Sequence, residues 1–538
     1  MRKTLAYLLL VCILATSGPG AVIGGALAEQ PEIVDGRFVT TRAITVEVFD
    51  RARDGGTKPE DNFYTDFIKE GMLRDHNVEV TFVPVPRWTE VDVLNNLLAA
   101  NDAPDVCVTY SYPTIVTYGQ MGGVTDLAPL LEEHKDLLPS LYALLGDENI
   151  NWNKQPESGT IWALEAKLFV NKRINTFVRE DWLKKLDLAE PKTLEEFEAI
   201  LRAFRDNAEL LLGADADKMI PFSTSYDVGW RGDHLLTSFV PEDFPEKDKY
   251  IHDFDDRHIL FPNYKEGVRV LNKWYNEGLI WKDFPLYPAG DATEDNLLKA
   301  GYIGAMIHNW DYPYRNGEDS IHANLQRAFG VDAGYIAVEP FPNDAGIYRK
   351  YLSAPIDRKI FFPATNDEPV ASLLYLDWLS TLENRRFLQI GEEGVTHEVA
   401  DNGAIRTLSV QGEKIMNSPN NIDYTITING LDVGDPELNL LSRALGYATV
   451  DQRYIQRAND LSDKDARYSK NYSVGVVAAE EGMGTALPNK RDIFLTQAVA
   501  APVAEFDKVF DDGMADYLSS GGQAIIDERA AKYAQYYE

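Results

Sequence analysis

Cysteine and histidine are scarce in this chain of 538 residues, which contains 2 Cys and 8 His. Cys12 lies inside the N-terminal apolar run, so a mature chain without that run keeps only Cys107, and no internal disulfide can form. Cys107 stands in the segment PDVCVTY, which reads as a buried strand, and we expect an inert core residue. No histidine pair has metal-ligand spacing on a predicted helix, and we expect no metal or other cofactor.

The signatures of common catalytic sites are missing as well. There is no G-x-S-x-G, no H-E-x-x-H, no P-loop lysine motif and no G-x-G-x-x-G after a strand. A pair of catalytic carboxylates stays open, because 85 acidic residues offer too many pairs to choose one. The formal net charge of −33 argues against nucleic acid and anionic membrane surfaces as partners. We therefore expect a protein without enzymatic activity.

Long hydrophobic runs are absent beyond the N-terminus. Arg2 and Lys3 precede an apolar run over 5–15, and the small-x-small pattern Ala26-Leu27-Ala28 follows. This order predicts a secretory signal peptide over 1–28, and no later run reaches the roughly 20 apolar residues of a membrane-spanning helix. The mature chain is therefore expected to be soluble and exported, to the periplasm or cell surface. Bulky Val11 before Cys12 argues against a lipid anchor there.

Strands and helices alternate in the first part of the chain. Strands are expected over 43–50, 77–86 and 104–110, with helices over 62–76 and 88–102 between them. This order predicts a parallel sheet covered by helices, hence an α/β fold. Further helices are expected over 177–188, over 193–204 with Thr193 and Glu196 as a capping box, and over 265–280 with Gly278 at its end. A chain of this length needs at least two domains.

Aromatic residues follow several predicted strands. Trp88 follows VEVTFVPVPR, Tyr110 and Tyr112 follow PDVCV, and Trp310 follows the apolar strand IGAMIHN. Ligands of open parallel sheets bind outside the carboxyl ends of the strands. A sugar ring stacks its C–H face on an aromatic ring while its hydroxyls need polar neighbours. These residues indicate a carbohydrate cleft, although a single tryptophan such as Trp310 can equally plug a core.

The chain resembles bacterial extracellular solute-binding proteins of oligosaccharide ABC importers, in the family 1-like, aldouronate or LplA-like branch. The segment REDWLKKLDLAEPKTLEEFEAILRAF (179–204) is similar to the family's D-W-L-x-K-L-x-L…P-x-T-x-x-E-F pattern. GTIWALEAKLFVNKRI (159–174), LNKWYNEGLIWKDF (271–284), GYIGAMIHNW, and the segments at 364–395 and 521–537 extend the resemblance over nearly the whole mature chain. In relatives the Trp at the end of the GYIGAMIHNW strand lines the cleft.

The resemblance implies a two-lobed, periplasmic-binding-protein-like α/β fold with a ligand cleft between the lobes and a hinge of crossing segments. Lobe 1 is placed at 29–165 with 342–400, and lobe 2 at 166–341 with 401–538. The implied function is capture of an oligosaccharide for an ABC permease, by a protein that is expected to be monomeric. A secreted carbohydrate-active hydrolase and a peptide-binding receptor on a related scaffold are the alternatives. Several relatives carry a calcium loop near 205–223, but Met219 and Pro221 interrupt the ligand ladder that would start at Asp215.

The predicted site joins residues of both lobes. The segment YDVGWRGD (226–233) reads as a loop that exposes a tryptophan beside an arginine, and arginine can bridge hydroxyls or hold a uronate carboxylate. Polar Asn309 and Asp311 flank Trp310, whose ring is expected to stack on one sugar unit. The predicted ligand-binding residues are Arg51, Trp88, Tyr110, Tyr112, Trp230, Arg231, Trp310 and Asp311.

Overall fold

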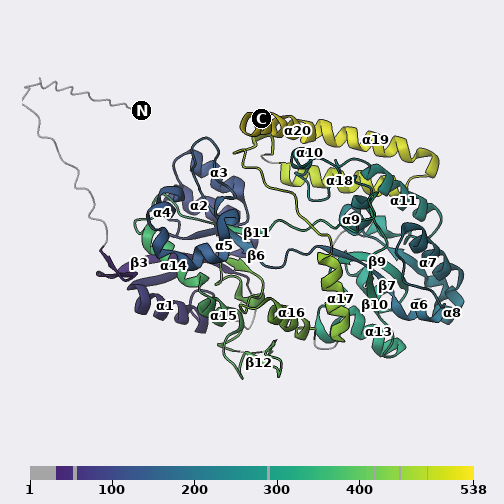
Figure 1. Ribbon diagram of the computed structural model, residues 1–538, viewed down its shortest axis with the longest axis horizontal. Helices are drawn as coiled ribbons and strands as arrows, with labels where there is room; N and C mark the ends of the chain where they lie inside the picture. Colours follow the sequence, from purple (N-terminus) through teal and green to yellow (C-terminus); the bar gives the residue numbers. More distant parts are fainter. Residues whose placement is uncertain are drawn as a thin grey trace, which may run out of the picture.

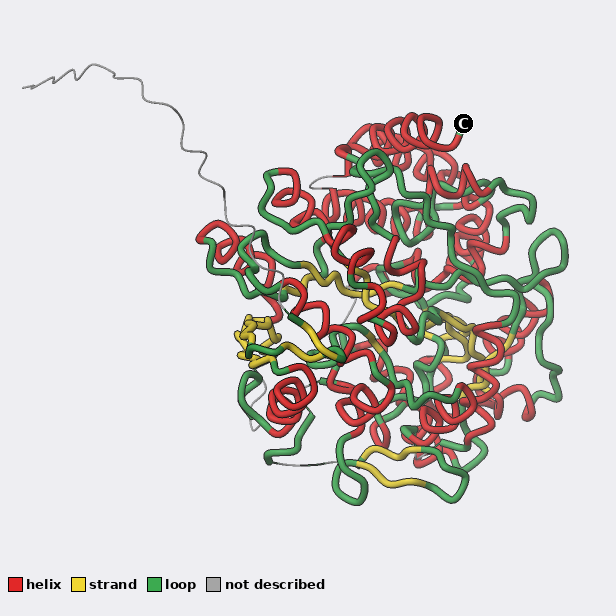
Figure 2. Tube along the Cα trace, turned by 60° about the vertical axis from the view of Figure 1, so that its left-hand side comes forward, coloured by secondary structure: helices red, strands yellow, loops and turns green. Residues whose placement is uncertain are grey.

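The structure is a computed structural model that describes residues 32–52, 57–287, 291–408, 410, 412–416, 418–447, 450–480 and 483–538. The predicted signal peptide and Cys12 lie outside these ranges. The described chain forms two lobes, each with its own sheet and its own hydrophobic core (Figure 1). In a second view the strands of both sheets lie inside shells of helices (Figure 2). The mixed α/β architecture in two lobes confirms the predicted fold class.

Lobe 1 is built on the strands expected from the sequence. β3 (Arg42–Asp50) pairs in parallel with β4 (Val78–Pro86), and a parallel bridge from Val46 to Val106 joins β3 to the segment before β5 (Cys107–Thr109). The sheet continues through β11 (Ile356–Phe361) to β6 (Leu164–Leu168) and β14 (Ile428–Asn429), with β11 antiparallel to its neighbours. Cys107 is a buried free thiol, as predicted, and it packs in a small cluster with Leu94, Ile115 and Phe361.

The helices of lobe 1 pack around this sheet. They are α1 (Phe63–His76), α2 (Glu90–Ala100), α3 (Tyr112–Gln120), α4 (Leu127–Glu133), α5 (Pro139–Asn151), α14 (Pro369–Ser380) and α15 (Leu382–Ile390). α14 is buried along its whole length, which explains why its sequence has no polar face. The short hairpins β1 (Ile33–Val34) with β2 (Arg37–Phe38) and β12 (His397–Val399) with β13 (Ile405–Thr407) complete the lobe.

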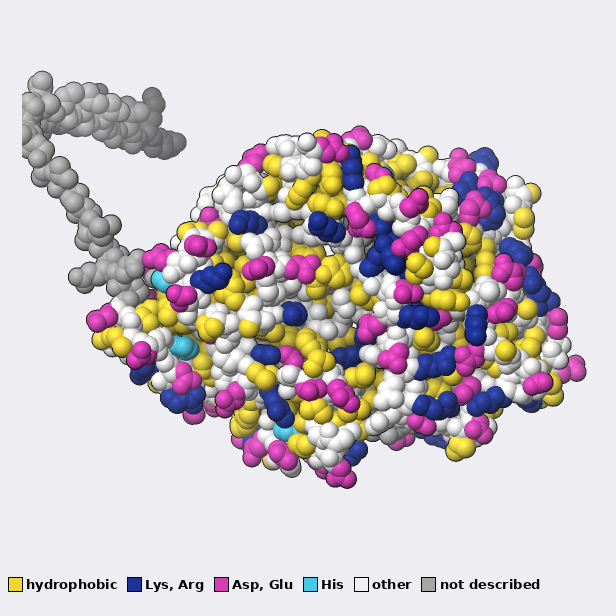
Figure 3. Space-filling model, viewed as in Figure 1, with side chains coloured by type: hydrophobic (Ala, Val, Ile, Leu, Met, Phe, Trp, Pro, Cys, Tyr) yellow, Lys and Arg dark blue, Asp and Glu magenta, His cyan; other side chains and the backbone are white. Residues whose placement is uncertain are grey.

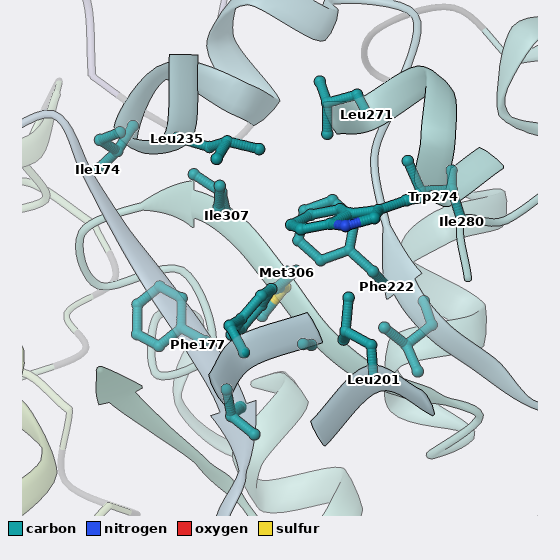
Figure 4. Packing of buried hydrophobic residues seen from close by; sticks show 14 of the residues in the cluster. Ile174, Phe177, Leu201, Phe222, Leu235, Leu271, Trp274, Ile280, Met306 and Ile307 are labelled. Carbon is teal, nitrogen blue, oxygen red and sulfur yellow. The ribbon is translucent and has the colours of Figure 1, made fainter. Parts of the chain in front are cut away.

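Lobe 2 has a four-stranded sheet in the order β10, β7, β9, β8. These strands are β7 (Ile174–Arg179), β8 (Ile220–Ser223), β9 (Ile303–Asn309) and β10 (Tyr335–Val338). Phe177, Met306 and Ile307 project from β7 and β9 into a core that also holds Phe222 and Trp274 (Figure 4). β8 and β9 are parallel and both antiparallel to β7, so their carboxyl ends lie where β7 enters the lobe from lobe 1.

Many helices surround this second core. They are α6 (Glu180–Lys185), α7 (Leu194–Asp206), α8 (Ala208–Leu212), α9 (Val228–Ser238), α10 (Glu246–His252), α11 (Tyr264–Asn276), α12 (Thr293–Lys299), α13 (Ile321–Phe329), α16 (Pro436–Leu445), α17 (Gln452–Asp463), α18 (Met483–Ala500), α19 (Phe506–Tyr517) and α20 (Gln523–Tyr537). Among the helices of the described ranges, none combines the length and apolar character that a membrane crossing requires.

The chain passes between the lobes in ordered segments that pair with one another. Asn171 and Ser353 exchange hydrogen bonds of 2.9 and 3.2 Å, and the Phe169 amide donates to the Asn429 carbonyl at 2.8 Å. Tyr351 packs on Val240 and Phe261 of lobe 2, and the chain rejoins the lobe 1 sheet at β11. Three crossings thus lie side by side, as a hinge requires.

The last crossing lies further along the chain than the sequence placed it. The resemblance places residues 401–538 in lobe 2, yet Tyr424, Ile426 and Ile428 pack in the core of lobe 1. β14 also pairs with β6 of that lobe. The segment up to residue 429 therefore packs with lobe 1, and the division of the rest of the chain stays a proposal.

Two predicted elements differ from the structure. The helix expected over 177–188 starts only at Glu180, because Phe177 and Val178 lie in β7, which is paired on both sides. The expected loop 226–233 is largely the first turns of α9, with Asp227 accepting from the Trp230 amide at 3.1 Å. At α7 the Thr193 hydroxyl accepts from the Glu196 amide, but the Glu196 carboxylate accepts from Lys192 rather than closing the capping box.

Candidate functional site

A cavity of about 400 Å³ opens between the lobes. On the side of lobe 1 it is lined by Tyr112 of α3 and by Trp152, Asn153 and Gln155. On the side of lobe 2 it is lined by Tyr250, the segment 471–478 and Arg529 of α20, and α3 faces α10 and α20 across the middle of the molecule (Figure 1). Aromatic rings alternate with amides and hydroxyls around this cavity. That mixture suits a ligand with apolar faces and many hydroxyls.

A second cavity of about 370 Å³ adjoins the first, and the two share Trp152, Tyr250, Asn471 and Arg529 in their walls. Its floor contains Arg173 and residues 352–354, which belong to the crossing segments. The Arg173 guanidinium lies 4.8 Å from the centre of the Trp230 ring and donates to the Asp256 carbonyl at 2.6 Å. The buried Nε of Arg173 has no hydrogen-bond partner among the described residues. A ligand at this floor would touch the hinge itself.

The charged groups that line the first cavity are paired with each other. Arg529 Nε donates to Glu480 at 2.6 Å, and its Nη1 donates to the carbonyls of Tyr250 and Asp253. Over the whole visible face, basic and acidic side chains are likewise interspersed (Figure 3). This cavity therefore presents mainly rings, amides and hydroxyls to a ligand rather than free charge.

Tyr112 is the predicted residue that lines the first cavity. Its hydroxyl donates to the Asn153 carbonyl at 3.4 Å and accepts from Gln155 at 3.1 Å, and burial raises its pKa. Tyr110, two residues earlier at the end of β5, stacks on Phe49 with ring centres 6.2 Å apart. Trp88, at the end of β4, is 75% exposed. These three aromatic residues follow the carboxyl ends of β4 and β5, where the sequence predicted a ligand.

The two predicted arginines are engaged inside the protein instead. Arg51 forms a two-pronged ion pair with Asp423 at 2.7 and 2.8 Å. Arg231 is 3% exposed, donates to the Ile307 carbonyl at 2.6 Å and pairs with Glu294 through both terminal nitrogens. Because Arg231 lies in α9 rather than in a loop, its side chain ties this helix to β9. In this geometry neither guanidinium is presented to a ligand.

Trp310 is buried, which corrects the expectation of an open stacking surface. Its side chain is 6% exposed and belongs to the core of lobe 2, with Arg443 at 5.9 Å from the ring centre. Asp311 is equally buried and pairs with Arg315 and the Tyr447 hydroxyl. The strand ends where it was predicted to end, but the ring turns into the protein. Of the two interpretations of Trp310 that the sequence allowed, the geometry favours a residue that closes the core.

Trp230 lies beside the hinge rather than free in a loop. Its indole Nε1 donates to Asn309 at 2.8 Å, and Arg173 and Arg257 lie at 4.8 and 4.9 Å from the ring centre. Through Arg173 this ring borders the second cavity. Trp230 therefore supports the cavity floor.

Sequence reasoning missed most of the cavity walls. Trp152, Tyr250, Tyr472 and Arg529 do not follow predicted strands, and they meet only through the packing of the C-terminal part against lobe 1. Arg87 was also missed, although it directly precedes Trp88. The abundance of tyrosine in the C-terminal segment was the available sequence signal for these walls. In the structure Tyr472, Tyr533 and Tyr537 of this segment pack against one another.

Acidic residues of 205–223, where several relatives carry a calcium loop, form ion pairs within the protein. Asp215 pairs with Lys218 at 2.8 Å within a short helical segment. Within the described ranges, no group of three or more His, Cys, Asp or Glu side chains is arranged to hold a metal ion.

Buried carboxyls support the cleft side of the lobe 1 sheet. The Glu90 carboxylate accepts from the Tyr110 amide at 3.1 Å and the Thr109 hydroxyl at 3.3 Å, which fixes the turn after β5. Glu165 accepts from Asn153 at 2.5 Å, and burial raises its pKa to about 7. Burial likewise raises the pKa of Glu47 to about 8. Glu90 thus holds the strand end that carries Tyr110, and Glu165 holds the cavity residue Asn153.

Comparisons with known proteins agree on one kind of protein. No family model matches the chain. Lipoprotein LipO of Bacillus subtilis (strain 168) is 26% identical over 42% of this chain, which spans 43% of LipO. The polygalacturonan/rhamnogalacturonan-binding protein YtcQ of the same organism is 22% identical over 85% of this chain and 86% of its own length.

The fold is also similar to that of a solved solute-binding protein. The HMO-binding, ABC-transporter-associated protein from Bifidobacterium longum infantis ATCC 15697 matches with a TM-score of 0.61 and 17% identity, over 93% of this chain and 99% of its own. Proteins of this kind bind a solute without transforming it. With the two lobes, the hinge and the cavity between them, these comparisons show that the chain is similar over most of its length to extracellular solute-binding proteins of carbohydrate ABC transporters.

Proposed function

We propose that this protein captures an oligosaccharide in the cleft between its lobes and delivers it to the transmembrane subunits of an ABC permease. The observation that carries the proposal is the first interlobe cavity, where Tyr112 and Trp152 of lobe 1 face Tyr250 and Tyr472 of lobe 2. Rings from both lobes around one cavity suit a sugar chain that the lobes enclose on closing.

The ligands of similar proteins support the ligand class. YtcQ is a polygalacturonan/rhamnogalacturonan-binding protein, and the similar structure from Bifidobacterium binds HMO. We propose that this protein acts outside the cytoplasmic membrane as a monomer, without a lipid anchor at Cys12 and without nucleic acid as a partner.

The proposal is tested by calorimetric titration with a panel of neutral and acidic oligosaccharides and with mixed peptides. Binding of at least one oligosaccharide, and of no peptide, is the expected result. Trp152→Ala and Tyr112→Ala should each weaken that binding about tenfold or more, if stacking on a sugar resembles the roughly 1–3 kcal/mol of stacking on a base. Phe387→Ala is the matched control, because this ring lines a separate hollow on α15.

Two results would contradict the proposal. Peptide binding without oligosaccharide binding would assign the cleft to a peptide receptor. Oligosaccharide binding that survives both cleft variants and falls with Phe387→Ala would move the site away from the interlobe cavity.

A further inference from the structure

Arg87 occupies an unusual place at the edge of the lobe 1 sheet. It directly follows β4, and its guanidinium carbon lies over three rings, at 4.2 Å from the centre of Tyr110, 5.2 Å from Phe49 and 5.4 Å from Trp88. Tyr110 is itself fixed, since it stacks on Phe49 and its amide donates to Glu90. The surrounding rings therefore restrict the position of the guanidinium.

The nitrogens of Arg87 are not used inside the protein. No carboxylate oxygen of the described residues lies within 4.0 Å of them, and they donate no hydrogen bond to these residues. Burial raises the pKa of Glu90, and the nearby charge of Arg87 only opposes that shift; the buried carboxyl accepts hydrogen bonds from Tyr110 and Thr109 instead. Arg51, which follows the neighbouring strand β3, differs from Arg87 because its guanidinium is paired with Asp423.

The surroundings of Arg87 fit a sugar that carries a negative charge. Acidic residues outnumber basic ones 85 to 52 in this chain, so an arginine without an acidic partner at a strand end is conspicuous. A guanidinium offers parallel N–H groups to a carboxylate, which an ammonium cannot do. Trp88, next in the chain and 75% exposed, offers a free ring face for the C–H side of the same sugar unit.

We propose that Arg87 and Trp88 form a subsite that binds a carboxylate-bearing unit of the oligosaccharide, that is, a uronic acid residue. This inference rests on the proposed function, because it assigns one unit of the ligand in the same interlobe cleft. Tyr112, which lines the first cavity, follows Tyr110 by two residues, so the ring beneath Arg87 is close in the chain to the cavity wall. The cavity thus binds the sugar rings and hydroxyls of the ligand, and Arg87 selects a ligand that carries a carboxylate.

The test is calorimetric titration with three acidic trimers, of galacturonate, mannuronate and glucuronate, and with the carboxyl-reduced neutral counterpart of each. The wild type should bind at least one acidic trimer about tenfold or more tightly than its neutral counterpart, and this preference should shrink at high salt. Arg87→Gln should abolish the preference for the acidic trimer. Arg87→Lys, which keeps the charge but loses the planar fork, should retain only part of it.

Arg386→Gln is the matched control, because it removes the same charge from the surface of lobe 1 at α15, away from the strand ends. It should keep the full preference. Circular dichroism and a melting curve show that Arg87→Gln is folded, and Arg87→Lys supplies the comparison if it is not.

Several outcomes would overturn the subsite. They are a wild type that binds every neutral trimer as tightly as its acidic partner, an Arg87→Gln variant that keeps the preference, and a control that loses it. If neutral oligosaccharides bind while no acidic trimer does, the subsite is refuted and oligosaccharide capture stands. If no saccharide binds at all, the proposed function fails and the subsite fails with it.

Discussion

At the scale of single residues, the buried carboxyl of Glu47 makes stability depend on pH. One oxygen accepts from the Val108 amide at 2.8 Å, and the other has no hydrogen-bond partner among the described residues. Burial raises the pKa of Glu47 to about 8 from an ordinary 4.5. The folded protein therefore holds a proton that the unfolded chain has released, and folding stability falls as pH rises between these values.

Glu47→Gln should remove that part of the pH dependence, because glutamine mimics the protonated carboxyl. The slope removed is at most about 1.4 kcal/mol per pH unit. Urea unfolding at pH 5, 6, 7 and 8 measures it: relative to wild type, the variant should gain free energy of unfolding at each step. Parallel curves for the two proteins would show that Glu47 ionises freely in the folded state.

Substitution by alanine should affect the unfolding free energy very differently at two tryptophans that follow strands. Trp310 is 6% exposed within the core of lobe 2, so Trp310→Ala should cost about 3–5 kcal/mol of unfolding free energy. Trp88 is 75% exposed, so Trp88→Ala should stay within about 0.5 kcal/mol of wild type. Urea unfolding measures both, and titration with oligosaccharide should show that Trp88→Ala binds more weakly. Equal stability losses would contradict this assignment.

Residue types at strand ends predicted the region of the site but not the orientation of each side chain. The positions of Trp88, Tyr110 and Tyr112 follow from the strand pattern alone. Whether a ring such as Trp310 turns inward depends on contacts from distant segments, here Arg443 of α16. Arg51 and Arg87 look equivalent in the sequence, and only the placement of Asp423, far along the chain, distinguishes them.

At the scale of elements, periodicity predicted lobe 1 well because its first strands and helices follow one another directly. β3, α1, β4, α2 and β5 all appear within a few residues of their expected bounds. The failure at 177–188 has a physical cause, since Phe177 and Val178 fit a helix face and a buried strand equally well. Residues 177 and 178 form a strand because they pair with β9 and β10, which lie more than 100 residues later in the chain.

The packing of α7 on β9 depends on Gly304, because glycine has no Cβ atom. A Cβ atom at Gly304 would lie 2.5 Å from the Phe204 ring and 2.9 Å from the Pro221 carbonyl. Both neighbours are buried, so Gly304→Ala should cost about 1–3 kcal/mol through overpacking. Gly484→Ala in α18 meets nothing within 4 Å and is the control, expected to be neutral or slightly stabilising. Chemical unfolding of both variants compares them, and an unaffected Gly304→Ala would disprove the close contact.

At the scale of the whole molecule, two separate cores joined by three crossings make relative motion of the lobes the natural response to a ligand. The C-terminal part adds a second connection, which we call the interlobe clasp: Tyr468, Asn471, Ser473, Gln535 and Tyr536. The Tyr468 hydroxyl donates to Glu148 at 2.9 Å, Asn471 donates to the Trp152 carbonyl at 2.9 Å, and Tyr536 donates to Glu157 at 2.8 Å. Because the clasp borders the cavity, it links ligand contacts to the position of the lobes.

Loosening the clasp should open the ligand-free protein. The double variant Tyr468→Phe with Tyr536→Phe removes two solvent-exposed hydrogen bonds between the lobes without altering either core. Small-angle X-ray scattering should then give a larger radius of gyration than wild type without ligand, and the same radius with saturating oligosaccharide. Affinity should fall by less than about a hundredfold, because the ligand must now recover only this small closing free energy. Tyr302→Phe, whose hydroxyl contacts Lys218 within lobe 2, should leave both radii unchanged. An unchanged ligand-free radius in the double variant would mean that the three crossings alone set the angle between the lobes.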